Sequence, residues 1–155
     1  MKLSLCWIGK TKEPAIRALS DEYLKRIRRY LPTEDHELRS QAALLELWKK
    51  ERPLARLVVL DARGRQMSSE ELSGFLASHR DRGTPALMFA VGPADGWSDE
   101  LAGYADAPRA DPGEPVLSLS LGKITMAHEI ARVVLLEQLY RACTILAGHP
   151  YHWGH

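Results

Sequence analysis

The stretch ITMAHEIARVVLLEQLYRACTILA, residues 124–147, is apolar on nearly every side of the helix that its periodicity predicts. Its polar groups are few and scattered: Arg132, Glu137, Gln138 and Arg141. A helix of this kind is buried on more than one side. In a chain of 155 residues, one side can face a sheet and a second copy of the chain can cover another across a twofold axis. We therefore expect a homodimer.

This helix ends in a tail that is rich in histidine, GHPYHWGH, residues 148–155. Gly148 is suited to the left-handed position after the last helical turn, and Pro150 prevents the helix from continuing. The tail carries three evenly spaced histidines, His149, His152 and His155. They could form a metal site, a catalytic tail or simply a polar end of the chain.

Four short apolar runs that close on glycine predict buried parallel strands: residues 2–9, 56–64, 86–92 and 115–122. Between them, apolar residues at three- and four-residue spacing predict amphipathic helices over residues 15–31, 42–50 and 69–80. Ser68 and Glu71 match a capping box, and Ser98 could cap a shorter helix over residues 98–105. Strands alternating with helices indicate an α/β fold built on a parallel sheet.

Composition limits the classes of protein that the chain can belong to. The 21 Lys and Arg residues nearly balance the 20 Asp and Glu residues, so no global basic field marks a nucleic-acid binder. Basic residues do concentrate near the start of the chain: Lys10, Lys12, Arg17, Lys25, Arg26, Arg28 and Arg29. The two cysteines lie far apart in apolar runs, and no run is long enough to span a membrane. We expect a single cytoplasmic domain that does not contact membranes.

Two glycine-containing loops follow predicted strands, GPADGWS at residues 92–98 and GKITMAHE at residues 122–129. In parallel sheets, ligands bind at the carboxyl ends of the strands, which is where these loops begin. Neither loop matches a phosphate-binding motif. Isolated glycines most often allow the backbone to adopt the conformation of a tight turn. The alternative is that their backbone N–H and C=O groups bind a small cofactor without phosphates.

Several segments occur together in a specific order: KLSLCWIGK (2–10), VVLDARG (58–64), GPADG (92–96), LSLGKITMAHEIARVVLLEQLYRA (119–142) and HPYH (149–152). In this combination the chain resembles the pseudouridine N3-methyltransferases of large-subunit ribosomal RNA, which belong to the SPOUT superfamily. The resemblance implies a SPOUT parallel-sheet α/β fold with a C-terminal trefoil knot, in one domain spanning residues 1–155. It also implies a homodimer that uses S-adenosylmethionine to methylate N3 of a pseudouridine in helix 69 of 23S rRNA.

The same resemblance implies the residues of the site. The cofactor would be bound by Leu60, Gly92, Gly122, Lys123, Ile124, Thr125, Met126 and Ala127. Methyl transfer to N3 requires loss of the imide proton, and a histidine titrates near neutral pH, so His152 is the candidate base. Tyr151 could hold the base, and Arg132, expected on the exposed start of the last helix, could balance the anionic ring. Arg132 could instead pair with Glu129, as Glu137 could with Arg141.

The sequence is also compatible with three other functions. The histidine tail could bind a metal in a hydrolase or carrier, although no acidic or cysteine partner lies nearby in the sequence, so we predict no metal. The segment after DHELRS (35–40) is shorter than in family members, which allows a catalytically silent ribosome-binding protein. A SPOUT enzyme acting on tRNA is a third possibility.

Overall fold

The computed structural model describes residues 1–51, 55–99, 101 and 116–154. At its centre lies a parallel sheet of five strands in the order β2-β1-β4-β3-β5. The strands are β1 (Lys2–Ile8), β2 (Thr33–Leu38), β3 (Ala55–Gln66), β4 (Ala86–Val91) and β5 (Val116–Ser120). The α/β fold with a parallel sheet, predicted from the sequence, is confirmed.

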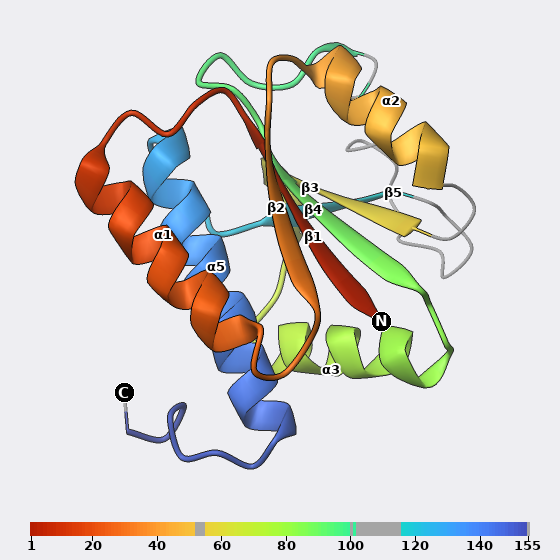
Figure 1. Cartoon of the computed structure of the whole chain (residues 1–155), viewed down its shortest axis with the longest axis vertical. Coiled ribbons are helices and arrows are strands. Elements are labelled where there is room, and N and C mark those ends of the chain that lie inside the picture. Colours follow the sequence, from red (N-terminus) through yellow and green to blue (C-terminus); the bar gives the residue numbers. More distant parts are fainter. Residues whose placement is uncertain (52–54, 100, 102–115, 155) are drawn as a thin grey trace.

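The described helices cover both faces of the sheet (Figure 1). They are α1 (Pro14–Ile27), α2 (Gln41–Glu51), α3 (Ser69–Asp81) and α5 (His128–Leu146). Helices α1, α3 and α5 share one apolar core with the sheet, whereas α2 packs against the other face through Leu44, Leu45 and Trp48. The described residues therefore form three layers, with α1, α3 and α5 on one side of the sheet and α2 on the other.

Local signals in the sequence set the ends of two helices. Ser68 and Glu71 form the predicted capping box at the start of α3, because each side chain accepts from the backbone N–H of the other residue. Helix α5 ends as predicted, with Gly148 in the left-handed region at φ 69°. The N–H of His149 donates to the carbonyl of Thr144, which completes a Schellman motif. Most of the short helix predicted from Ser98 lies outside the described residues.

Strand β2 was not predicted. Its sequence, TEDHEL, contains a single apolar residue and lacks the apolar run that marked the other strands. It lies at the edge of the sheet and pairs with β1 only. An edge strand with solvent beside it needs no continuous apolar sequence, so the pattern used for buried strands could not detect it.

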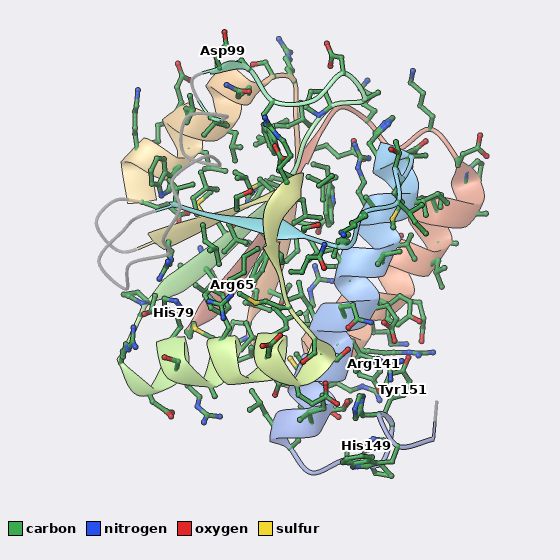
Figure 2. All side chains as sticks on the ribbon, turned by 180° about the vertical axis from the view of Figure 1, so that it is seen from behind. Arg65, His79, Asp99, Arg141, His149 and Tyr151 are labelled. Carbon is green, nitrogen blue, oxygen red and sulfur yellow. The ribbon has the colours of Figure 1, made fainter. Side chains whose placement is uncertain are left out.

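The end of β3 passes directly over β5. Pairing of β3 with β5 follows one register up to Leu60 and resumes in another at Arg65, so the chain between them leaves the regular ladder. In Figure 2 this segment crosses in front of β5. A Cβ atom added at Gly64 would lie 2.7 Å from the carbonyl carbon of Ser118 and 2.8 Å from the amide nitrogen of Leu119. The crossing is compatible with the expected trefoil knot, which stays a prediction because residues 102–115 lie outside the described chain.

None of the helices within the described residues is both long and apolar enough to cross a membrane.

We predict that Gly64→Ala lowers the free energy of unfolding by about 3 kcal/mol, because the new methyl group meets the backbone of β5 and that strand must shift. Denaturant unfolding of the purified variant measures the effect. Gly74→Ala is the matched control, because Gly74 lies within α3 with open space around it and should gain about 0.5–1 kcal/mol. Equal stability of Gly64→Ala and the natural protein would contradict the close crossing.

Candidate functional site

A cavity of about 250 Å³ opens at the carboxyl edge of the sheet. Its walls come from the middle of β3, where the pairing with β5 is interrupted, from the ends of β4 and β5 with the loops that follow them, and from the first turn of α5. The lining residues of the β3 and β4 segments include Leu60, Asp61, Gly92, Pro93, Gly96 and Trp97. Those after β5 include Leu121, Gly122, Ile124, Thr125, Met126 and His128. The cavity thus lies where ligands bind in parallel α/β proteins.

Trp97 forms one wall of this cavity. Its indole Nε1 donates a hydrogen bond of 2.7 Å to the backbone carbonyl of Leu60. The indole also lies so close to Gly92 that an added Cβ there would come within 2.9 Å of it. Ser98, the next residue, receives a hydrogen bond from the Gln41 side chain of α2 and donates its N–H to that side chain at 2.9 Å. The loop after β4 is therefore held against both β3 and α2.

Ser120, at the end of β5, joins the loop that follows it to β3 beside the cavity. Its hydroxyl accepts a 3.1 Å hydrogen bond from the Gly122 N–H. The same hydroxyl can donate to the carbonyl of Ala62, also at 3.1 Å. Gly122 adopts φ 125°, a backbone conformation that favours glycine. The chain after β5 can therefore turn sharply beside the end of β3.

Six of the eight predicted cofactor positions line the cavity: Leu60, Gly92, Gly122, Ile124, Thr125 and Met126. Lys123 and Ala127 lie in the same loop but are not part of the lining, and both are exposed. Whether any of these positions binds a cofactor stays a prediction. Asp61 and His128 also line the cavity, although sequence reasoning assigned them no binding role. The position of Asp61 directly after the apolar residues 57–60 of its strand was the signal that could have identified it.

Asp61 places a charged group in this mostly apolar cavity. Its carboxylate accepts hydrogen bonds from the backbone N–H of Arg63 at 2.9 Å and from its guanidinium at 3.1 Å. These bonds, with the side-chain bond contributing most, lower the pKa of Asp61. The cavity therefore contains an ionised acceptor at neutral pH beside its backbone groups.

The tail that carries Tyr151 and His152 lies at the opposite end of α5 from the cavity. Arg141, which contacts both residues, is 13 positions after His128, or roughly 20 Å along the helix axis. Figure 2 shows Arg141 and Tyr151 together at that end of the helix. Within one chain, the structure does not bring the predicted catalytic residues and the predicted cofactor positions together.

Glu137 and Arg141 hold the tail against α5. The pair predicted from their four-residue spacing is present, with Arg141 Nη2 2.6 Å from Glu137 Oε1. The hydroxyl of Tyr151 donates to the same carboxylate oxygen at 3.1 Å, and its ring packs edge-on against Tyr140. Burial, reinforced by contacts with Tyr23 and Glu137, raises the pKa of the Tyr151 phenol. Tyr151 is therefore a neutral hydrogen-bond donor at physiological pH.

Both ring nitrogens of His152 have partners in this arrangement. Arg141 Nη1 lies 3.3 Å from His152 Nδ1, and a guanidinium can only donate, so Nδ1 accepts. Nε2 then carries the proton and donates to Glu70 Oε1 at 2.8 Å. Glu70 lies on α3, 82 residues away in sequence, and no local pattern could have predicted this contact. His152 must lose Arg141 from Nδ1 before it can accept a proton.

The expected exposure of Arg132 is wrong. Its side chain is 1% exposed and turns toward the loop between β1 and α1. There it donates to the carbonyls of Ile8 and Gly9 at 3.1 and 3.0 Å and to the hydroxyl of Thr11 at 2.9 Å. Glu129 does not pair with it but accepts from the backbone N–H of Lys12 at 2.6 Å. Helix periodicity placed Arg132 correctly on α5 but could not show that the β1–α1 loop covers it.

The histidines of the tail do not form a metal site in the described part of the chain. No group of three or more His, Cys, Asp or Glu residues there is placed to hold a metal ion. The Nδ1 atom of His149 instead accepts from the N–H of Tyr151 at 3.2 Å. The third residue of the proposed clip, His155, lies outside the described residues.

The cavity at the carboxyl edge of a parallel sheet, beside a strand crossing, is accompanied by a family match. Residues 1–152 match a family model described as "Predicted SPOUT methyltransferase". The chain belongs to the SPOUT methyltransferase family.

Individual relatives are similar over their whole lengths. The chain is 54% identical over 158 residues to Ribosomal RNA large subunit methyltransferase H of Koribacter versatilis, covering 100% of both chains. It is 43% identical over 162 residues to the protein of that name from Geobacter sp. strain M21, covering 98% of this chain and 99% of the relative. The corresponding protein of Geobacter sulfurreducens is 39% identical with the same coverage.

We predict that Glu137→Gln releases the tail, because the neutral amide weakens the bonds to Arg141 and to the Tyr151 hydroxyl. Losing a charge-assisted contact of this kind costs about 1.5 kcal/mol, so the backbone amides of the tail should exchange hydrogen roughly tenfold faster. Hydrogen exchange followed by mass spectrometry measures this. Glu22→Gln is the matched control, because Glu22 makes the same type of pair with Arg26 on α1. An unchanged rate of hydrogen exchange in the tail of Glu137→Gln would show that Glu137 does not hold the tail against α5.

Proposed function

We propose that the protein is an S-adenosylmethionine-dependent methyltransferase that methylates N3 of a pseudouridine in helix 69 of 23S rRNA. The observation that carries this proposal is the cavity at the carboxyl edge of the sheet, built from the segments that carry the family resemblance. The names of the relatives, which refer to methylation of large-subunit ribosomal RNA, support the substrate class. We take residues 1–155 as one catalytic domain that acts in the cytoplasm.

The residues of the cavity fit S-adenosylmethionine by their chemistry. Leu60, Leu121, Ile124 and Met126 provide an apolar slot for the adenine and the methionyl chain. Exposed backbone groups of the glycine-containing loops can read the polar edge of the base, and Asp61 can accept from hydroxyl or ammonium groups. A volume of about 250 Å³ is close to the lower end of the usual range for small-molecule sites, about 300 Å³. When bound, the cofactor supplies the methyl group on its sulfonium.

Methyl transfer to N3 requires a base that removes the imide proton and a group that orients the nucleobase. We assign the first role to His152 and the second to Tyr151, whose aromatic face suits an unstacked base. Binding of the nucleotide would displace Arg141 from His152 and free Nδ1, the ring nitrogen that carries no proton. Arg132 is buried against the β1–α1 loop, so we assign it a positioning role without contact with the base.

The active unit that we infer is a homodimer in which one subunit's tail reaches its partner's cavity. Two observations support it. The cavity and the tail lie at opposite ends of α5, so an antiparallel neighbour could bring them together. In addition, Ile130 on α5 and Leu19 on α1 remain 47% and 43% exposed, which leaves apolar surface for a second chain to cover.

RNA binding would rely on local basic surface, because the net charge is only +1. Lys25 and Arg29 are exposed on and just after the last turn of α1, and Lys49 and Lys50 are exposed on α2. In a dimer, the helices of both subunits could flank one RNA groove. Phosphate contacts of this kind make binding weaker as salt rises.

The test of the proposed substrate is mass mapping of modified nucleosides in ribosomal RNA. A strain that lacks the protein should lose N3-methylpseudouridine from helix 69, and restoring the protein should restore it. An unchanged level would reject the substrate and favour a tRNA target or a catalytically silent ribosome-binding protein. Calorimetric titration with S-adenosylmethionine separates the last two, because a silent protein has little reason to retain the cofactor.

We predict that His152→Ala abolishes most methyl transfer and leaves cofactor affinity within about twofold, because proton removal typically contributes a factor of 10² or more. Radiolabelled methyl transfer and calorimetry measure the two quantities. Trp153→Ala is the control, since Trp153 is the neighbouring tail residue and is 84% exposed. Parallel loss of cofactor binding would mean that the tail shapes the cavity and performs no proton transfer.

Mixed dimers test whether the site is shared between subunits. Gly92→Val should close the cavity, because its Cβ meets the Trp97 indole, so this homodimer and the His152→Ala homodimer should both be inactive. In a dimer of one subunit of each kind, the His152→Ala subunit supplies an intact cavity and the Gly92→Val subunit supplies an intact tail. One complete site and about half of the natural activity would therefore remain. Activity near zero in the mixed dimer would show that each chain uses its own tail.

A further inference from the structure

A second cavity, of about 320 Å³, lies between α3 and the strands β3 and β5. It is lined by Arg56, Arg65, Met67, Glu71, Gly74, Phe75, Ser78, His79, Arg82 and Leu117. None of these residues lines the cavity at the carboxyl edge of the sheet. Figure 2 shows Arg65 and His79 together, beside α3 and away from the tail. The second cavity is therefore a separate site.

Positive charge dominates the described part of its walls. Among the described residues, three arginines, Arg56, Arg65 and Arg82, line the cavity together with one acidic residue, Glu71. Glu71 already accepts the Ser68 N–H in the capping box at 2.7 Å. Within the described ranges, the side chains of Arg65 and Arg82 make no hydrogen bond or ion pair. Those two guanidiniums are available to an anion.

The floor of the cavity is rigid. Arg56 is 8% exposed, and its Nη1 donates to His79 Nε2 at 3.3 Å. His79 is therefore protonated on Nδ1, which donates to the Thr84 hydroxyl at 2.8 Å. The Phe75 ring packs against both, with Arg56 above its face and His79 at its edge. These contacts fix the Arg56 guanidinium before any ligand arrives.

His79 carries no charge at neutral pH, so the positive charge of the cavity comes from the arginines. Burial, followed by the nearby charges of Arg56 and Arg82, lowers the pKa of His79 to about 4. The imidazole is therefore neutral and acts as a hydrogen-bonding support for Arg56. Apolar surface from Met67 and Leu117 borders the guanidiniums and reduces solvent screening of their charge.

We propose that this second cavity binds a phosphate group through Arg65 and Arg82, with Arg56 adding positive charge at the floor. The planar fork of a guanidinium matches the oxygens of phosphate, and charge-assisted bonds of this type are the strong ones. The phosphate could belong to an RNA backbone or to a free phosphate compound, since the chemistry at the cavity is the same. The site does not depend on the proposed methyl transfer.

Titration with inorganic phosphate at constant ionic strength tests the site, followed by backbone amide shifts of the purified protein in NMR. We expect saturable shifts at Gly74, Ser78 and Leu117. Arg65→Gln and Arg82→Gln should each weaken binding about fivefold, the effect of losing one exposed charged contact. Arg80→Gln is the matched control, because Arg80 is exposed on the last turn of α3, two residues before Arg82, and does not line the cavity.

Shifts that fail to saturate would overturn the proposal, and so would equal weakening by Arg80→Gln. Binding of a short RNA hairpin then identifies the source of the phosphate. If it is RNA, the double variant Arg65→Gln/Arg82→Gln binds the hairpin more weakly. The slope of the logarithm of its binding constant against the logarithm of the salt concentration also becomes shallower by about 1.5. If it is a free phosphate compound, hairpin affinity stays unchanged while the phosphate shifts are lost. Neither readout requires methyl transfer, so failure of the proposed function would be seen separately.

Discussion

The close passage of the β3 end over β5 is the constraint on which the rest of the structure depends. Before the crossing, Leu60 and Asp61 contribute to the cavity at the carboxyl edge. At the crossing, Gly64 leaves no room for a side chain above the backbone of Ser118 and Leu119. Ser120, the last residue of β5, donates a hydrogen bond to the carbonyl of Ala62 in β3. Three segments separated in sequence are thereby fixed around one space, and the cavity needs no bound ligand to define its walls.

Helix α5 keeps the cavity and the tail of one chain apart. Its first turn borders the cavity through His128, and its last turns bind the tail through Glu137 and Arg141. A helix of 19 residues is rigid over its length of about 28 Å, so it holds these two ends apart. The same rigidity would place them together in an antiparallel pair of subunits. Such a pair would also cover apolar residues of α5 that one chain leaves exposed, among them Ile130 and Leu146.

Sequence reasoning predicted the elements whose patterns are local. Apolar runs predicted the strands β1, β3, β4 and β5. The capping box of Ser68 and the end of α5 at Gly148 were predicted from residues a few positions away in the sequence. Strand β2 was missed because an edge strand can be polar. The burial of Arg132 and the contact of His152 with Glu70 depend on chain segments 124 and 82 residues away, respectively, so no periodicity encodes them. For the same reason, the family resemblance indicated the loops that line the cavity but not the separation of the tail from them.

The first turns of α5 also connect the cavity to the basic surface of α1. While His128 lines the cavity, Glu129 accepts the backbone N–H groups of Lys12 and Glu13 just before α1 begins. One turn later, Arg132 binds the carbonyls at the end of β1. A guanidinium that is buried among carbonyls loses most of its hydration, so these bonds must all be kept for the loop to be stable. The helix that borders the proposed cofactor site therefore also fixes where α1 starts, and with it the position of the cations that we propose contact RNA.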